Sequence, residues 1–244
     1  MLVRADLHIH TVLSPCGSLD MSPEKIVSKA KKVGLDIIAI TDHNSIFNAF
    51  AVKSLAEREG IKVIFGMEAQ TIEEVHILTL FEKREQIEKF YSQIYDFLPE
   101  IENDPEYFGD QIIVDEESNI LGVEKKLLAN SLKLSIEELF DYVNNHGGYM
   151  IPSHIERDRF GLLTNLYKIP TVLKDCVMEI SYNADMEELF KFYPFLKTYP
   201  LISNSDAHYP EDIGRAYTEY EVESTSLSAI YKSARKGFYK VFRK

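Results

Sequence analysis

Several features are scarce in this chain of 244 residues, and each absence excludes a class of protein. There are only two cysteines, Cys16 and Cys176, which are too few for the disulfide framework of a small secreted domain. No run of about 18 apolar residues is present, which argues against a membrane span. The N-terminus lacks the basic, apolar and small-residue segments of a secretion signal. We therefore expect a cytoplasmic protein without membrane contact.

Basic residues are also in deficit, because 27 Lys and Arg stand against 39 Asp and Glu, for a formal net charge of −12. A surface of this sign repels nucleic acid at long range, so the charge disfavours nucleic acid as a partner. Residues 232–244 are an exception, with six Lys or Arg and no acid. In so acidic a chain we interpret this tail as a solvated basic helix and chain end.

Apolar patterning predicts strands that alternate with helices. The predicted strands cover 5–11, 35–41, 61–70, 74–81, 149–153, 177–181, 201–205 and 217–222, and the predicted helices cover 23–33, 45–59, 83–98, 135–146 and 186–197. Such alternation is typical of an α/β fold with a parallel sheet, open or closed into a barrel, here as a single domain over 1–244. Residues 100–130 break the rhythm with a hairpin signal, so we interpret them as an insertion that could act as a lid.

The stretch ADLHIHT, from Ala5 to Thr11, raises a specific question. The period of two of a strand places Asp6, His8 and His10 on one face. Burying three titratable groups without partners is unfavourable, so something must compensate for it. Four more histidines follow or interrupt predicted strands: His43, His76, His154 and His208. The seventh, His146, ends a helix, where it suits the helix dipole and needs no further role.

Two carboxylates, Glu68 and Asp206, also lie in or just after predicted strands. In folds of this class the active site lies beyond the carboxyl ends of the strands, so we expect these groups to meet the histidines there. Imidazole and carboxylate are the usual ligands of divalent cations, which would take up the buried lone pairs. The set exceeds what one tetrahedral ion uses, so we predict two or three divalent metal ions.

These motifs, in this order, resemble those of the polymerase and histidinol phosphatase (PHP) family. They are Asp6-Leu-His-Ile-His10, Thr41-Asp-His43, Gly66-Met-Glu68, Glu74-Val-His76, Ser153-His154 and Asn204-Ser-Asp-Ala-His208. The resemblance covers residue 6 to about residue 208, most of the chain. It implies a distorted (β/α)7 TIM-like barrel with a metal site at the C-terminal ends of the strands. It also implies up to three ions, commonly zinc, manganese or iron, and hydrolysis of phosphoesters.

Carried over residue by residue, the resemblance implies three ligand sets. The first is His8, His10, Glu68 and Asp206, the second is Glu68, His76 and His154, and the third is His43, His208 and a residue of the loop after His10. In that loop the family has histidine or aspartate, whereas this chain has Cys16, with Asp20 as an alternative. A thiolate can bind zinc or iron. Asp6 and Asp42 are expected to orient histidines.

The implied chemistry is attack on phosphorus by a water that two neighbouring ions acidify. Asp206 and His208 are candidate catalytic residues for protonating the leaving group. Arg157 and Arg159 are candidates for binding the substrate phosphate, because guanidinium matches phosphate with a bidentate fork. Pairing of these arginines with Glu156 or Asp158 on the surface is an equally compatible interpretation. Glu179 is a strand-end acid that could line the pocket, and Cys176 is expected to be buried.

Four functions are compatible with the sequence. The first is a phosphoesterase acting on a small phosphorylated metabolite, and the second is a nucleotide phosphatase or a 5′–3′ exonuclease acting on oligonucleotides. The third is an amidohydrolase, but that class typically bridges its metals with a carboxylated lysine, and here Glu68 is the bridging candidate. The fourth is a non-catalytic metal-binding regulatory protein. The sequence leaves the substrate, the metal and the oligomeric state open.

Overall fold

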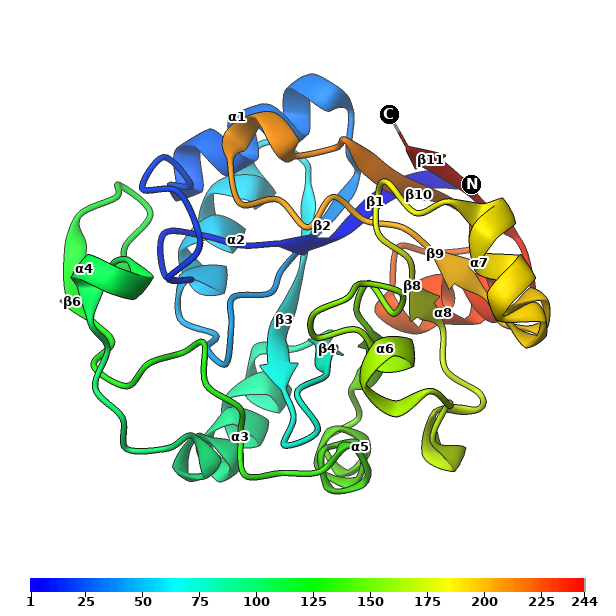
Figure 1. Ribbon diagram of the computed structural model, residues 1–244. Helices are drawn as coiled ribbons and strands as arrows, with labels where there is room; N and C mark the ends of the chain where they lie inside the picture. The colour runs from blue at the N-terminus through cyan, green and yellow to red at the C-terminus, as the bar shows by residue number, and fades with distance from the viewer. Residues whose placement is uncertain (244) are drawn as a thin grey trace.

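The computed structural model describes residues 1–243, which fold around a curled sheet of seven strands (Figure 1). The strand order is β11-β10-β1-β2-β3-β4-β7. The bounds are β1 Leu2–Ile9, β2 Ile37–Ile40, β3 Lys62–Gln70, β4 His76–Phe81, β7 Tyr149–Pro152, β10 Ala216–Glu221 and β11 Tyr239–Arg243. A separate pair, β8 (Met178–Glu179) and β9 (Leu201–Ile202), is parallel. Backbone bonds from Ile155 N to Glu179 O and from His10 N to Ala207 O link this pair to the segments beside it.

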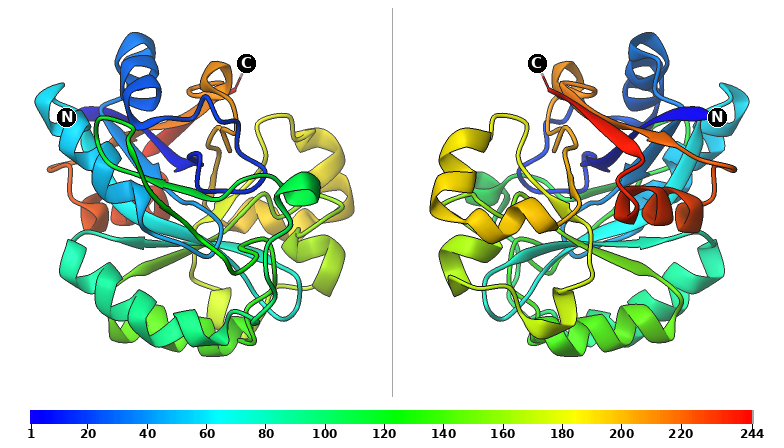
Figure 2. Two further views of the ribbon diagram at one scale, coloured as in Figure 1. Left: turned by 90° about the vertical axis from the view of Figure 1, so that its left-hand side faces the viewer. Right: turned by 90° about the vertical axis from the view of Figure 1, so that its right-hand side faces the viewer.

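Helices surround the strands, as Figure 2 shows from two sides. They are α1 Pro23–Val33, α2 Asn48–Arg58, α3 Arg84–Ile94, α5 Ile136–Asn145, α6 Leu162–Leu166, α7 Met186–Phe192 and α8 Leu227–Arg235, with short 3-10 turns at Tyr95–Phe97, Thr171–Leu173, Pro194–Thr198 and Pro210–Asp212. The predicted ends of α1 are confirmed, because the Ser22 side chain accepts from Lys25 N and Gly34 adopts the left-handed conformation. α2 begins at Asn48, three residues later than predicted.

The prediction of a parallel sheet is wrong at β4 and also at β10, which runs antiparallel to both β1 and β11. β1, β2 and β3 are parallel, but β4 runs antiparallel to both β3 and β7. The cause is the connection from Gln70 to His76, a tight turn in which Thr71 N donates to Val75 O. A parallel return would need a crossover of a dozen or more residues. As a result the first residue of β4, His76, lies at the same edge of the sheet as the last residues of β3 and β7.

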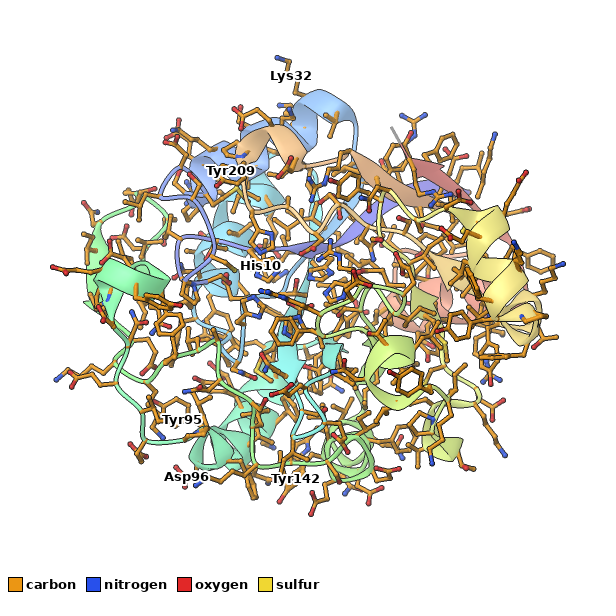
Figure 3. All side chains as sticks on the ribbon, viewed as in Figure 1. His10, Lys32, Tyr95, Asp96, Tyr142 and Tyr209 are labelled. Atoms are coloured by element: carbon orange, nitrogen blue, oxygen red, sulfur yellow. The ribbon has the colours of Figure 1, made fainter. Side chains whose placement is uncertain are left out.

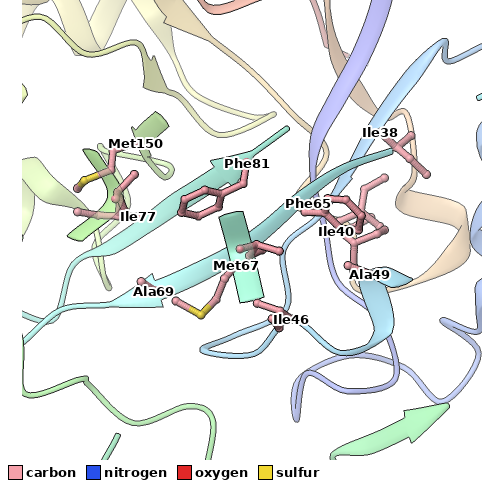
Figure 4. Packing of buried hydrophobic residues seen from close by; sticks show 14 of the residues in the cluster. Ile38, Ile40, Ile46, Ala49, Phe65, Met67, Ala69, Ile77, Phe81 and Met150 are labelled. Atoms are coloured by element: carbon pink, nitrogen blue, oxygen red, sulfur yellow. The ribbon is translucent and has the colours of Figure 1, made fainter. Parts of the chain in front are cut away.

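The two faces of the curled sheet carry two buried apolar clusters. On the outer face, strand residues pack against helices α1, α2, α3 and α5. Figure 4 shows part of this cluster, with Phe65 of β3 close to Ile40 of β2 and Ala49 of α2. On the inner face, Leu7, Ile64 and other alternate strand residues pack with one face of α8. The polar site therefore lies at the end of the strands, above an apolar interior.

The hydrogen bonds of Asp6 differ from the expectation that it orients a histidine. Val3, Ala5 and Leu7 belong to the inner cluster, whereas Ile9 belongs to the outer one. The pairing of β1 with β2 is irregular between Asp6 and Ile9, so the period of two is broken there. The side chain of Asp6 contacts the segments after β9 and before β10. Its carboxylate accepts from Ser205 N at 2.9 Å and Gly214 N at 3.2 Å, so it holds a backbone loop instead of orienting a histidine.

Residues 100–130 contain the predicted hairpin, β5 (Ile112–Val114) with β6 (Ile120–Val123), and a short helix α4 (Pro105–Phe108). Figure 1 places them at the left margin, on the other side of the molecule from α7. The basic tail continues from α8 into β11, which pairs with β10 up to Arg243. Lys232, Lys236 and Lys240 are exposed, as the interpretation of a solvated basic segment expects. Among residues 1–243, no helix combines the length and apolarity that crossing a membrane requires.

A candidate metal centre at the ends of the strands

Five histidines surround the buried carboxylate of Glu68, which is 1% exposed. Its Oε1 lies 3.2 Å from His8 Nε2, 3.3 Å from His76 Nδ1 and 3.3 Å from His154 Nε2. Its Oε2 lies 3.2 Å from His43 Nδ1 and 3.5 Å from His10 Nε2. Figure 3 labels His10 near the middle of the molecule, inside the ring of helices. The structure thus brings together predicted residues from β1, β3, β4 and the segments after β2 and β7.

A second carboxylate, Asp206, completes this cluster from the loop after β9. Its Oδ1 lies 3.3 Å from His8 Nε2, 3.3 Å from His10 Nε2 and 3.6 Å from His208 Nδ1. Its Oδ2 lies 2.7 Å from Nη2 of Arg157. The Asp206 carboxylate therefore contacts both the histidines and the guanidinium of Arg157.

Cys16 lies beside His208 at the outer side of the cluster. Its Sγ is 3.1 Å from His208 Nε2, and one donor atom from each of His10, Cys16, His43 and His208 lies within 4.8 Å of the others. The alternative residue Asp20 is exposed and forms an ion pair with Lys25. Of the two loop residues that the sequence offered, the structure brings Cys16 to the histidines.

Hydrogen bonds fix the tautomers of four histidines. His8 Nδ1 lies 3.0 Å from Glu179 Oε1, His76 Nε2 3.1 Å from Gln70 Oε1 and His208 Nδ1 3.0 Å from the Asp206 carbonyl. These oxygens can only accept, so each of these nitrogens carries the hydrogen. The other ring nitrogen of each histidine then directs its lone pair into the cluster. This is the arrangement in which histidines bind metals, with the outer N–H held by an acceptor.

The fourth histidine, His10, is held through an intermediate hydroxyl. Its Nδ1 lies 2.9 Å from Ser14 Oγ, and Ser14 Oγ donates its hydrogen to Asp42 Oδ1 at 2.7 Å. Asp42 also accepts from Thr11 N and Thr11 Oγ1. The expectation that Asp42 orients a histidine thus agrees with the geometry, but the contact passes through Ser14.

Sequence reasoning missed Ser14 and Gln70 and left Glu179 with only a loose role. For Gln70 a signal existed, because it lies two residues after Glu68 on the same strand and therefore on the same face. Glu179 also accepts from Asn204 Nδ2 at 2.7 Å and from His154 N at 3.2 Å. Because these contacts join residues that are far apart in the chain, no local sequence pattern predicts them.

Two residues of the cluster have left-handed backbone conformations that non-glycine residues rarely adopt. His154 has a φ of 29° and Asp206 a φ of 49°. His154 lies two residues after the end of β7 and Asp206 four residues after the end of β9, so the chain turns sharply where each side chain enters the cluster. Such conformations are unfavourable by about 1–3 kcal/mol each, and they concentrate at functional sites.

Burial and neighbouring charge shift the pKa values of the cluster. Burial and the nearby His208 lower the pKa of His10 to about 4, and burial lowers the pKa of His43 well below its usual value. Burial opposes ionisation of Glu68, but His76 and His8 nevertheless hold its pKa well below the usual range. Neutral imidazole and ionised carboxylate are the forms that bind metal ions. Burial raises the pKa of the Cys16 thiol, and the carboxylates of Glu68 and Asp206 raise it further.

The two predicted phosphate-binding arginines have different positions. Arg157 pairs with Asp206 and is 35% exposed, so it lies at the rim of the cluster. Arg159 is exposed and forms no hydrogen bond or ion pair with other residues of the described chain. Glu156, the surface partner considered for both arginines, instead accepts from the backbone N–H and hydroxyl of Ser181.

The donor set fits divalent cations. Three buried atoms, His43 Nδ1, Glu68 Oε1 and His154 Nδ1, have no hydrogen-bond partner among residues 1–243. Buried polar atoms without partners are unfavourable by about 1–3 kcal/mol each. Two of them, His43 Nδ1 and Glu68 Oε1, face the cluster of imidazole and carboxylate groups. A metal ion bound there would satisfy such lone pairs, and these ligand types suit zinc, manganese and iron.

Comparison with family models gives two matches. The model of the PHP domain matches residues 6–150, and the model of a PHP-associated region matches residues 197–238. The first match covers more than half of the chain and includes all the predicted ligands up to His76. The second includes Asp206 and His208.

Among curated proteins, the chain is 38% identical over 79 residues to an uncharacterised protein of Methanocaldococcus jannaschii. It is 37% identical over 71 residues to the PolC-type DNA polymerase III of Bacillus subtilis. Each match covers 29% of this chain, with 46% of the first protein and 5% of the second. The chain thus matches less than half the length of these relatives.

Among solved structures, the lesion-specific endonuclease Q of Pyrococcus furiosus superimposes with a TM-score of 0.69 at 23% identity, over 99% of this chain and 58% of that one. An endonuclease Q complex with duplex DNA carrying an abasic lesion gives a TM-score of 0.70 at 22% identity, with the same coverage. A two-domain protein of Bacteroides vulgatus, containing a predicted PHP-like metal-dependent phosphoesterase, gives 0.62 at 18% identity over 100% of this chain and 65% of that one. At these identities the matches establish the fold.

Proposed function

The chain belongs to the PHP family of metal-dependent phosphoesterases, and we propose that its histidine cluster binds two or three divalent metal ions and hydrolyses a phosphoester of a small phosphorylated molecule or nucleotide. The observation that carries the proposal is the geometry of Glu68. One buried carboxylate lies within 3.5 Å of nitrogens from five histidines, a crowding that bound cations would stabilise.

The ligand assignment is part of the proposal. We assign His8, His10, Glu68 and Asp206 to one ion, Glu68, His76 and His154 to a second, and Cys16, His43 and His208 to a third. The short distances from Asp206 Oδ1 to His8 and from Glu68 Oε1 to His76 and His154 support the first two sets. His10 also lies within the Cys16 group, and His43 also lies within 4.8 Å of Glu68 and His76, so these two histidines adjoin two sets each. We further propose that the strands around the centre form a distorted TIM-like (β/α)7 barrel, with the metal site at the C-terminal ends of the strands.

The residues of the chain have distinct tasks in the proposed reaction. Bound divalent ions would supply an acidified water and polarise the phosphoester. Glu68 holds the histidine nitrogens around one point, and Glu179 and Ser14 keep His8 and His10 in the tautomers that direct lone pairs inward. Arg157 carries guanidinium N–H groups at the rim, where they can bind the non-bridging oxygens of a phosphate.

The proton for the leaving oxygen has two predicted donors, Asp206 and His208. Both oxygens of Asp206 are already engaged, one by histidines and one by Arg157. His208 is 23% exposed at its side chain and lies closer to the opening. We therefore favour His208 for this role when the third ligand set is empty.

The charge of the chain supports a small substrate. With a net charge of −12 the protein repels long polyanions. Among residues 1–243, Arg157 is the Arg or Lys that forms an ion pair with a carboxylate of the cluster, whereas Arg215 donates to the backbone carbonyl of Asp206. Hydrolysis of nucleic acid is the second candidate. It is favoured by the superposition on endonuclease Q, which covers nearly this whole chain and whose substrate is duplex DNA. The alternative of a metal-binding regulatory protein without activity predicts metal content without turnover.

One experiment separates these functions. The purified chain is analysed for bound metals and then assayed on p-nitrophenyl phosphate, histidinol phosphate, nucleotides and oligonucleotides, at low and high salt. The proposal expects bound divalent metal and turnover of small phosphoesters with weak salt dependence. Steeply salt-dependent cleavage of oligonucleotides alone would favour the nuclease. Stoichiometric metal with no hydrolysis of any substrate would contradict both.

A further inference from the structure

The turn that carries Cys16 is fixed to the metal cluster at several points. Gly17 N donates to Ser14 O at 2.8 Å, which closes the turn around Cys16. On one side of the turn, Ser14 Oγ bonds to Asp42 and His10. On the other side, Ser18 N donates to the carbonyl of His208 at 2.8 Å. The backbone therefore ties Cys16 to the two segments that carry His10 and His208.

Close packing restrains the same turn further. A Cβ atom at Gly17 would lie 2.5 Å from the carbonyl oxygen of Thr11, so a side chain there would force the turn open. A Cβ atom at Gly109, in the 100–130 insertion, would lie 2.2 Å from the carbonyl oxygen of Pro15. The insertion thus packs directly on the residue before Cys16. The position of the sulfur is a property of the packed structure and not of a free loop.

The surroundings of the sulfur are those of a ligand. His208 Nδ1 carries its hydrogen toward a carbonyl, so the Nε2 lone pair faces Cys16 Sγ at 3.1 Å. His43, which is 7% exposed, belongs to the same group of donor atoms. A thiol, two imidazoles and a third imidazole from His10 thus converge within 4.8 Å.

We propose that Cys16, His43 and His208 form a thiolate subsite that selects thiophilic divalent ions, zinc above all, and discriminates against manganese and magnesium. The proposal rests on the proposed metal centre and deepens it. Sulfur is a soft ligand that favours zinc, whereas manganese and magnesium prefer oxygen ligands. When the sulfur–metal bond forms, the S–H bond breaks and its proton passes to solvent. The other two ligand sets contain only imidazole and carboxylate, so they tolerate a wider range of ions.

The first test is spectroscopic and needs no activity. The metal-free chain is loaded with Co²⁺, and the thiolate-to-cobalt charge-transfer absorption is recorded for the wild type, C16S and C16D. We expect the band in the wild type and its loss in both variants. The same band in C16S would overturn the proposal. So would its absence in a wild type that has bound the full complement of cobalt.

The second test compares the reactivity of the two cysteine thiols of the chain. Cys16 is exposed and Cys176 is buried far from the cluster, so Cys176 serves as an internal control for unfolding. Zinc should slow the reaction of Cys16 with a thiol reagent by about tenfold or more, whereas excess Mg²⁺ should not. Equal reactivity of Cys16 with and without zinc, at unchanged Cys176 reactivity, would contradict the proposal.

Competition dialysis with elemental analysis then measures the selectivity itself. In mixtures of zinc and manganese, the C16D variant should bind manganese at the one subsite where the wild type prefers zinc. The metal content of the other sites should match that of the wild type. Unchanged zinc content in C16D and C16S would reject the thiolate subsite yet leave the phosphoesterase proposal intact. A wild type that binds no metal at all would instead reject the metal centre from which the subsite derives.

Discussion

Arg157 and Asp206 form an ion pair at the rim of the metal centre, with Arg157 Nη2 2.7 Å from Asp206 Oδ2. The other carboxylate oxygen, Oδ1, faces His8 and His10 at 3.3 Å. The Arg157 guanidinium therefore has two proposed roles at the site. It fixes the orientation of a proposed metal ligand, and its remaining N–H groups can bind a phosphate that enters from solvent.

Replacing Arg157 with alanine should weaken substrate binding more than metal binding. A charge-assisted hydrogen bond contributes about 1.5–3 kcal/mol, so we expect kcat/KM to fall roughly 10- to 100-fold, chiefly through KM. Arg159→Ala, two residues away and without a polar contact, is the matched control and should behave as the wild type. Steady-state kinetics on a small phosphoester measures both variants. Equal losses in the two variants would indicate a non-specific charge effect.

Replacing Glu68 with glutamine should lower both metal content and turnover. Glutamine has the same size as glutamate, but it offers one acceptor oxygen and a donor NH₂ group. The NH₂ group is a poor metal ligand, so the side chain can no longer serve both ligand sets. We expect about one metal ion fewer per chain and a decrease in turnover of about 100-fold or more. Elemental analysis and kinetics on the same sample test this, with Glu85→Gln on the exposed start of α3 as the control. A fully loaded, fully active Glu68→Gln variant would refute the shared-ligand assignment.

The ligand residues could be predicted from the sequence because each follows or interrupts a short apolar run. His43 and His154 come directly after β2 and β7 segments, and the strand ends of an α/β fold converge whatever the details of the sheet. Alternation and apolar content are the same for parallel and antiparallel strands, so only the short connection between the predicted strands 61–70 and 74–81 indicates the direction of β4. His76 therefore looked irregular, although the antiparallel direction places it at the shared edge.

The supporting contacts were harder to foresee for a different reason. Asp6 is two residues before His8 in the sequence, but its carboxylate accepts hydrogen bonds from Ser205 N and Gly214 N, about 200 residues away in the chain. Ser14 and Glu179 bind histidines through contacts between distant elements, which depend on how the segments pack. Local patterns carry no information on such contacts. Residues that bind the outer nitrogen of a metal-ligating histidine can therefore be identified only from the structure.

Replacing Ser14 with alanine should weaken metal binding without removing a ligand. The change breaks the path from Asp42 through Ser14 to His10 Nδ1, so the imidazole loses the contact that fixes its tautomer. Loss of such outer contacts typically lowers metal affinity about 10- to 100-fold. Competition with a chelator measures the affinity. Ser92→Ala, on the exposed side of α3, is the control, and identical chelator curves for Ser14→Ala and the wild type would contradict the role of Ser14.

In the metal-free protein, the contribution of His10 to stability should decrease as the pH falls from about 6.5 to 4. Its pKa in the folded state is lowered to about 4 by burial and by His208, so the unfolded chain binds a proton in this window that the folded chain does not. Unfolding then takes up protons, and the His10 contribution decreases by about 3 kcal/mol at most across the window.

Other groups act in the opposite direction, so the test is a difference between variants. Burial raises the pKa of Asp6 to about 6, and the carboxylates of Glu179 and Glu68 overcome burial to raise that of His8; both shifts favour the folded state at lower pH. Urea denaturation of metal-free wild type and His10→Gln at pH values of about 7 and 4.5 should show a smaller pH effect in the variant. His146→Gln, outside the cluster, should keep the wild-type slope.

Replacing Asn48 with alanine should release the 100–130 insertion from α2. The buried side chain of Asn48 donates to Thr11 Oγ1 at 2.9 Å and to Ile112 O at 3.0 Å, and accepts from Val114 N at 3.0 Å. Alanine leaves the buried carbonyl of Ile112 and the N–H of Val114 without this partner, so we expect a loss of about 1–3 kcal/mol in the free energy of unfolding.

The same substitution should expose the insertion to proteolysis, because β5 is bound to α2 through this side chain. Urea denaturation and limited proteolysis measure the two effects, and Asn145→Ala, exposed at the end of α5, should change the stability by no more than about 0.5 kcal/mol. Because the insertion packs against Pro15, next to Cys16, the release should also make the Cys16 thiol react faster. Faster cleavage within 100–130 without a change at Cys16 would show that the insertion does not hold the Cys16 turn.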